Sequence, residues 1–331
     1  MSKPVRVQGI ECPIIREGDD IVDIVVNAID KDLIEDKAII GITESIVARA
    51  AGQYITVDDI AKDVIKKFGE NATIYLFNPI YSRNRFAIIL KGIARGAKKL
   101  IINMPEYDEV GNPSGINPFT GVDIKAYYKE LCESENCECE IINENRSLPY
   151  NTIYCGLHDY DKHSGWSLKD ICSDVSPDWG VLGTNKSTEE KLKLFPSKIE
   201  AQRICDEIKM KIYHQYGKNA IVCVYGDGCF KDPVGGIWEF ADPITMPAYT
   251  DKELMESTPF ELKLKNMIDE NPSNEDIEHK IAEKYADTTI TPMNRMGTTP
   301  RIYRDLLASL MDLTSGSGDR ATPVVLINNY F

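Results

Sequence analysis

Two loops that combine glycine with aspartate are the parts of the sequence best suited to binding phosphate. Residues 226–228 (Gly-Asp-Gly) follow a β-type run, and residues 316–319 (Gly-Ser-Gly-Asp) precede another. Glycine lets the backbone approach a phosphate closely, and aspartate can hold a divalent cation that bridges phosphate oxygens. The same residues are also typical of tight turns with solvated aspartates, which are common. The loops permit a nucleotide and metal site without establishing one.

Several common catalytic signatures are absent from the sequence. There is no G-x-x-x-x-G-K-[ST] phosphate loop, no G-x-G-x-x-G at a strand–helix junction and no G-x-S-x-G nucleophile elbow. The four histidines, at positions 158, 163, 214 and 279, are too scattered to support a triad or a multi-histidine metal centre. If the protein is an enzyme, we expect carboxylates, glycines and a bound metal to carry its chemistry.

The cysteines point to free thiols. There are nine, an odd number, and they are spread through a long chain as in proteins of a reducing compartment. Cys132, Cys137 and Cys139 form one cluster, but C-x₄-C-x-C lacks the paired C-x₂₋₄-C spacing of zinc sites. We interpret these three residues as ordinary thiols.

Composition narrows the classes of function. The 331 residues are 43% hydrophobic and 27% charged, which is ordinary for a globular protein of about two domains. A formal net charge of −14 argues against nucleic-acid and membrane binding. No segment reaches the ~18–20 apolar residues of a membrane span, and no apolar signal core follows the N-terminus. We expect a cytoplasmic protein.

The elements expected to position the loops follow from hydrophobic spacing and capping residues. Asp19 and Asp20 are suited to begin a helix. A buried strand at residues 38–42 leads into a helical segment at 43–52, and a helix at 198–216 precedes a strand at 220–225. Further expectations are a turn-rich segment at 181–188, a charged helical region at 252–285, a helix capped by 298–300 and a strand at 323–327.

The central part of the chain has its own rhythm. Strands are expected at 73–77, 99–103 and 138–143, and helices at 83–96 and 122–131. Strands that alternate with helices in this way indicate a βαβαβ layer. Residues 105–121 are rich in Gly, Pro and Asn and predict a long loop, of the kind that can overhang a site.

Five segments occur in the order of one family's signature segments. Residues 13–20 read Pro-Ile-Ile-Arg-Glu-Gly-Asp-Asp, against Pro-Leu-Ile-Lys-x-Gly-Asp-Asp in that family. Residues 46–52 read Ile-Val-Ala-Arg-Ala-Ala-Gly, against Ile-Val-Ser-Lys-Ala-Glu-Gly, and 188–196, 222–236 and 306–325 are similar to three later segments. The chain thus resembles the coenzyme F-420 (F420-0):gamma-glutamyl ligase family over 5–56 and 179–327.

The resemblance implies a mixed α+β and α/β ligase fold and a set of site residues. Family members join L-glutamate to a carboxylate of the coenzyme through an acyl phosphate, with GTP and divalent cations such as Mg²⁺ or Mn²⁺. The implied nucleotide-binding residues are Glu44, Ser45, Arg49, Thr188, Gly316, Gly318 and Asp319. The implied metal ligands are Asp227 and Asn185.

Departures from the family pattern bear on substrate and domains. Residues 183–188 read Gly-Thr-Asn-Lys-Ser-Thr where the family has Gly-Ile-Asp-x-Ser-Asn, so Asn185 replaces a metal-binding aspartate and Thr188 an asparagine. An amide binds a hard cation less well than a carboxylate. Arg49 replaces a phosphate-facing lysine. Residues 71–178 match nothing in the pattern and are interpreted as a βαβαβ insertion between ligase parts 1–70 and 179–331.

The leading hypothesis is therefore a ligase, dependent on GTP or ATP and on Mg²⁺ or Mn²⁺. It would attach glutamate, through a gamma-glutamyl linkage, to a small-molecule carboxylate acceptor. The alternative is a non-catalytic relative that binds a metabolite or nucleotide and has a degraded metal site. A third reading makes the βαβαβ segment a separate catalytic domain. A homodimer is expected, since it is the commonest assembly and the resemblance also implies it.

Overall fold

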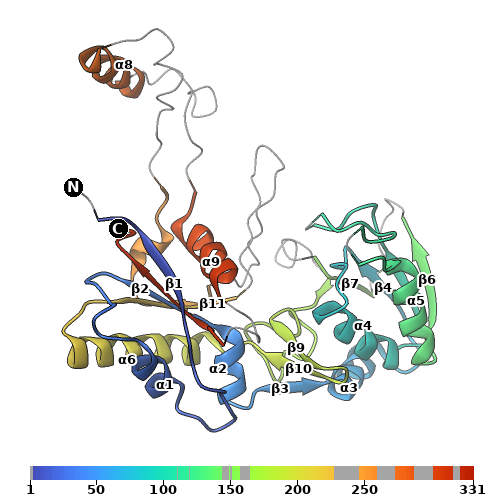
Figure 1. Cartoon of the computed structure of the whole chain (residues 1–331). Helices are drawn as coiled ribbons and strands as arrows, with labels where there is room; N and C mark the ends of the chain where they lie inside the picture. Colours follow the sequence, from blue (N-terminus) through green and yellow to red (C-terminus); the bar gives the residue numbers. More distant parts are fainter. Residues whose placement is uncertain are drawn as a thin grey trace.

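The computed structural model describes residues 3–109, 111–118, 120–143, 149, 151–156, 165–226, 246–258, 273–286, 301–315 and 321–331. Three sheets with helices packed on them form a mixed architecture, part of it parallel and part antiparallel (Figure 1). This confirms the predicted mixture of α+β and α/β structure. None of the helices in these ranges is long and apolar enough to cross a membrane.

The first sheet brings the two ends of the chain together. Its strand order is β1-β13-β2-β11-β12, and β2 and β11 are its parallel pair. Strand β1 runs antiparallel to β13, so the N- and C-terminal segments lie side by side (Figure 1). The strands are β1 (Arg6–Ile10), β2 (Ile39–Thr43), β11 (Ile221–Tyr225), β12 (Ala248–Tyr249) and β13 (Val324–Asn328).

Alternate residues of this sheet enter two separate cores, as the period of a strand requires. On β2, Ile40 and Ile42 belong to the core under α1 and α6, whereas Ile39 belongs to the core under α9. These helices cover opposite faces of the sheet (Figure 1). Their bounds are α1 (Ile21–Ala28), α6 (Lys198–Tyr216) and α9 (Tyr303–Thr314).

The predicted starts of the helices are largely confirmed. The side chain of Asp20 caps α1 by accepting hydrogen bonds from the amides of Val22 and Asp23, both at 3.0 Å. Helix α6 begins at the predicted residue, where Ser197 accepts from the amide of Glu200 at 3.2 Å. Residues 298–300, expected to cap the following helix, lie outside the described residues.

The second sheet confirms the predicted βαβαβ layer. Its order is β6-β5-β4-β7-β8 and every pairing is parallel. The predicted elements are β4 (Thr73–Phe77), α4 (Arg85–Arg95), β5 (Lys99–Asn103), α5 (Ile124–Ser134) and β6 (Glu138–Ile142). Two short strands, β7 (Thr152–Tyr154) and β8 (Trp166–Ser167), extend the sheet beyond the prediction.

The third sheet corrects the interpretation of residues 181–188 as turn-rich. Residues Thr184–Thr188 form strand β9, which pairs antiparallel with β10 (Lys191–Leu194), and β10 also pairs with β3 (Tyr54–Thr56). The Asn, Lys, Ser and Thr side chains of β9 favour a turn locally, but pairing with β10 satisfies its backbone. This small sheet lies between the other two (Figure 1).

Helix α3 (Val57–Phe68) follows β3 and was not predicted. A capping box starts it: the hydroxyl of Thr56 accepts from the amide of Asp59 at 3.1 Å, and Asp59 accepts from the amide of Thr56 at 3.0 Å. Buried residues of α3 and β10 pack in the same core as the second sheet. The division into 1–70, 71–178 and 179–331 stays a prediction.

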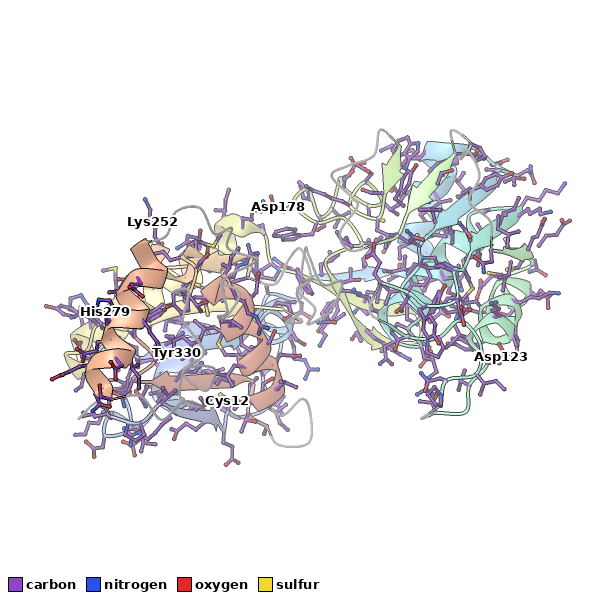
Figure 2. All side chains as sticks on the ribbon, turned by 90° about the horizontal axis from the view of Figure 1, so that it is seen from above. Cys12, Asp123, Asp178, Lys252, His279 and Tyr330 are labelled. Carbon is purple, nitrogen blue, oxygen red and sulfur yellow. The ribbon has the colours of Figure 1, made fainter. Side chains whose placement is uncertain are left out.

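Two loop regions complete the described chain. The described residues among 105–121, which exclude 110 and 119, form the predicted long loop, and in it Asp108 accepts a hydrogen bond from the amide of Tyr81 at 2.8 Å. In the expected helical region at 252–285, the structure has a short 3₁₀ helix, Lys252–Met255, and α8 (Asn274–Ala286). Seen from above, Asp123 lies far out on the lobe of the second sheet and Asp178 lies toward the junction of the lobes (Figure 2).

Candidate functional site

The candidate site begins where the two parallel strands of the first sheet end. Thr43, the last residue of β2, pairs with Tyr225, the last residue of β11. Helix α2 (Glu44–Ala50) starts directly after β2. The carboxyl ends of parallel strands are where α/β proteins collect functional side chains. Glu44 and Ser45 therefore lie at the same sheet edge from which the chain leaves β11 at Gly226.

Glu44 is a buried carboxylate held by an amide. Its side chain is only 4% exposed, and its Oε1 accepts a hydrogen bond from the side-chain Nδ2 of Asn185 on β9. A buried carboxylate needs such donors because it has lost its water. The bond attaches the β9–β10 hairpin to the start of α2.

Lys193 reaches the same place from the neighbouring strand. It is the direct cross-strand partner of Asn185, it is 9% exposed, and its ammonium donates to the hydroxyl of Ser45. Leu192 and Leu194 enter the core of the second sheet, so the alternation of the strand turns Lys193 the other way, toward α2.

The charges around Lys193 are unbalanced. Burial is the main reason that the pKa of Lys193 lies below its ordinary value; the Arg49 guanidinium lowers it further, while the Glu44 carboxylate acts in the opposite direction. Arg49 lies one helical turn after Ser45 and is exposed. Within the described ranges, neither Lys193 nor Arg49 forms an ion pair with a carboxylate.

Tyr225, at the end of β11, is buried in the core between the sheet and α9. It is 1% exposed, its hydroxyl lies 3.4 Å from the carbonyl of Met311, and burial raises its pKa well above the usual range. Gly41 on β2 makes this packing possible, since a Cβ there would fall 1.9 Å from the sulfur of Met311. The side chains of α9 thus press directly on the strand that leads to Glu44.

The structure brings together four of the predicted site residues, which are Glu44, Ser45, Arg49 and Asn185. Thr188 lies elsewhere, at the far end of β9, where it is exposed and its hydroxyl accepts from the amide of Glu190 at 3.3 Å. The remaining predicted residues are outside the described ranges: Asp227, Gly316, Gly318 and Asp319.

The described residues do not by themselves fit a divalent cation. No group of three or more His, Cys, Asp or Glu side chains that could hold a metal ion occurs among them. Glu44 supplies one carboxylate and Asn185 at most one amide oxygen, so Mg²⁺ would take its other ligands from water, substrate phosphates or residues outside the described ranges. The ammonium of Lys193 beside them also repels a cation. Because Asp227 lies outside the described residues, the assignment of Asp227 and Asn185 as metal ligands stays a prediction.

Sequence reasoning missed Lys193 and Tyr225. The alternation Lys-Leu-Lys-Leu at 191–194 was a usable signal, because it puts both lysines on the face opposite two core leucines. Such a face is usually solvated, however. Nothing in the local sequence shows that α2, some 140 residues earlier in the chain, covers Lys193.

A comparison with models of known protein families identifies the family of this chain. The family model described as F420-0:Gamma-glutamyl ligase matches residues 9–329. A comparison with curated proteins gave no match. The family match spans nearly the whole chain, including residues 71–178. The chain therefore belongs to the F420-0:gamma-glutamyl ligase family and is an enzyme of the ligase class.

Proposed function

We propose that the protein joins the amine of L-glutamate to a carboxylate of a small-molecule acceptor at the expense of a nucleoside triphosphate, GTP or ATP. The observation that carries the proposal is the pair of cations, Lys193 and Arg49, beside the hydroxyl of Ser45 at the carboxyl edge of β2 and β11. Membership of the ligase family supports it. The deazaflavin coenzyme named by the family is the first acceptor to test.

The reaction has two steps whose atoms balance. A carboxylate oxygen of the acceptor attacks the γ-phosphorus, the bond from that phosphorus to the nucleoside diphosphate breaks, and an acyl phosphate forms. The glutamate amine then attacks the acyl carbon, inorganic phosphate leaves with the electron pair of the C–O bond, and the amine releases a proton. Both steps concentrate negative charge, so fixed cations and hydrogen-bond donors aid them.

The described residues supply parts of such a site. Lys193 and Arg49 offset anionic charge on phosphate or carboxylate oxygens, and Ser45 offers a hydroxyl next to them. The hydrogen bond between Asn185 and Glu44 holds the hairpin that carries Lys193 against α2. A divalent cation, Mg²⁺ or Mn²⁺, is part of the proposal, because it would offset charge on the phosphate oxygens.

A second candidate function is favoured by Asn185. Because this position carries an amide rather than an acid, the site could bind a nucleotide or metabolite without transferring glutamate. The two candidate functions differ in whether amide is formed. Binding occurs in both, but only a ligase releases phosphate in proportion to the amide formed.

The test is a binding panel followed by a turnover assay. GTP and ATP are titrated calorimetrically into the protein with Mg²⁺, with Mn²⁺ and with neither. Phosphate release is then measured with glutamate and a panel of carboxylate acceptors, the deazaflavin coenzyme first. Glutamate-dependent phosphate release with an equal amount of amide supports the ligase. Nucleotide binding without any such release supports the non-catalytic candidate instead.

A further inference from the structure

Lys193 is a buried lysine that forms no ion pair with a carboxylate in the described part of the chain. Only 9% of it is exposed, and its one hydrogen bond within the described residues goes to the neutral hydroxyl of Ser45. Lysines are almost never buried this far unless a carboxylate pairs with them. The nearby carboxylate of Glu44 forms no ion pair with it and is already bound by the amide of Asn185.

The rest of strand β10 shows what a purely structural residue looks like there. Leu192 and Leu194 fill the core on one face. Lys191, on the same face as Lys193, places its ammonium 4.0 Å from the centre of the Tyr54 ring, a favourable cation–π contact. Lys193 neither fills the core nor stacks on an aromatic ring. An apolar side chain of similar length would therefore be buried at this position with a smaller loss of folding free energy.

A second cation next to Lys193 makes the imbalance larger. Arg49 follows Ser45 by four residues on α2, so their side chains share a helix face. Its guanidinium is near enough to Lys193 to disfavour the lysine's charge. In a chain of net charge −14, two like charges around one hydroxyl, with no carboxylate paired to either among the described residues, are most simply explained by an anion that binds between them.

We propose that Lys193 and Arg49, with the hydroxyl of Ser45 between them, bind one oxyanion of a substrate, a phosphoryl group or a carboxylate. Lys193 acts as a point charge that the β9–β10 hairpin fixes in place, and Arg49 as an adjustable fork on the exposed side. This assignment rests on the proposed function only for the source of the anion. Lys193 is then a binding residue, and it can reach the anion only while the β9–β10 hairpin is packed against α2.

The test compares Lys193→Met with Lys191→Met. Methionine keeps most of the length of the lysine side chain and removes its charge. Lys191 is the matched control, because it lies on the same face of the same strand. Inorganic triphosphate and L-glutamate are titrated separately into wild type and both variants. We expect Lys193→Met to lose at least about tenfold in affinity for one of these anions, and Lys191→Met to stay within about twofold.

A folding measurement accompanies the titrations. Without ligand, Lys193→Met should melt at the same temperature as wild type or higher, because it no longer buries an unpaired charge. A structural lysine would give the opposite result, a lower melting temperature with unchanged anion affinity, and that would overturn the inference. Failure of wild type to bind either anion would overturn it as well.

The outcomes separate this inference from the proposed function. If wild type forms amide and Lys193→Met binds both anions and turns over equally well, the role of Lys193 is wrong and the ligase stands. If triphosphate or glutamate binds in a Lys193-dependent manner but no acceptor yields amide, the inference stands and the ligase proposal is wrong.

Discussion

Asn185 donates its side-chain amide to the buried carboxylate of Glu44, a residue 141 positions earlier in the chain. Together with the hydrogen bond from Lys193 to Ser45, this bond fastens the β9–β10 hairpin to the start of α2. The hairpin carries Lys193 and the helix carries Ser45 and Arg49, so the bond between Asn185 and Glu44 helps to hold these three residues together.

Loss of this amide should destabilise the protein. In Asn185→Leu the buried carboxylate of Glu44 loses the hydrogen bond from Asn185, which we expect to lower the free energy of unfolding by about 1–3 kcal/mol. Urea unfolding measures the change. Ser187→Ala, at an exposed position on the same strand, is the control and should be nearly neutral. Equal stabilities for wild type and Asn185→Leu would show that the bond contributes nothing.

Asn185→Asp should increase the affinity of the site for divalent cations. It puts a second carboxylate beside Glu44, and without metal the like charges should lower the melting temperature. With Mn²⁺ or Mg²⁺ the two acids gain a shared cation. We expect a larger Mn²⁺-induced rise in melting temperature for the variant than for wild type. Identical responses would contradict this reading of the site.

Much of the fold could be predicted because its signals are local. The βαβαβ layer at residues 73–142 follows from alternating strand and helix patterns, and Asp20 and Ser197 sit where they cap helices. Strand β9 could not be predicted, since its polar residues favour turns and only the pairing with β10 makes it a strand. Helix α3 was within reach, because Thr56 and Asp59 have capping-box spacing.

The stability effect of Lys193 should depend on pH. Its pKa is lowered on folding, so between that lowered value and 10.5 the unfolded chain binds more protons, and stability rises with pH. Below this window the buried charge costs its full amount. The stability advantage of Lys193→Met over wild type should therefore be largest below the lowered pKa of Lys193 and shrink toward pH 10.5. Chemical denaturation at several pH values checks this, and a constant difference would contradict it.

Gly92 on α4 should not tolerate alanine. A Cβ there would fall 2.6 Å from the Cβ of Ile60 on α3, so the two helices would have to separate. Such overpacking costs about 1–3 kcal/mol, while alanine gains about 1 kcal/mol of helix propensity. We expect a net loss of up to about 2 kcal/mol in urea unfolding. Gly115→Ala, which meets no atom within 4 Å, is the control; a Gly92→Ala as stable as the wild type would contradict the prediction.

The candidate site was harder to predict than the fold. Glu44, Ser45, Arg49 and Asn185 came from the family resemblance, and the structure brings all four to one place. Lys193 came from neither source, because its burial depends on a contact between β10 and α2 that no local pattern encodes. Thr188 was predicted from its position in the family motif, but it lies at the exposed end of β9, away from Glu44, Ser45 and Lys193.

The most direct test of the proposed ligase is glutamate-dependent phosphate release. Wild type and Arg49→Met are incubated with GTP or ATP, Mg²⁺ or Mn²⁺, glutamate and each acceptor in turn, and phosphate and amide are quantified together. The proposal predicts equal amounts of phosphate and amide from wild type, and at least about a tenfold lower rate from Arg49→Met, as expected when a charged contact is lost. Nucleotide hydrolysis that ignores glutamate, or no product with any acceptor, would contradict it.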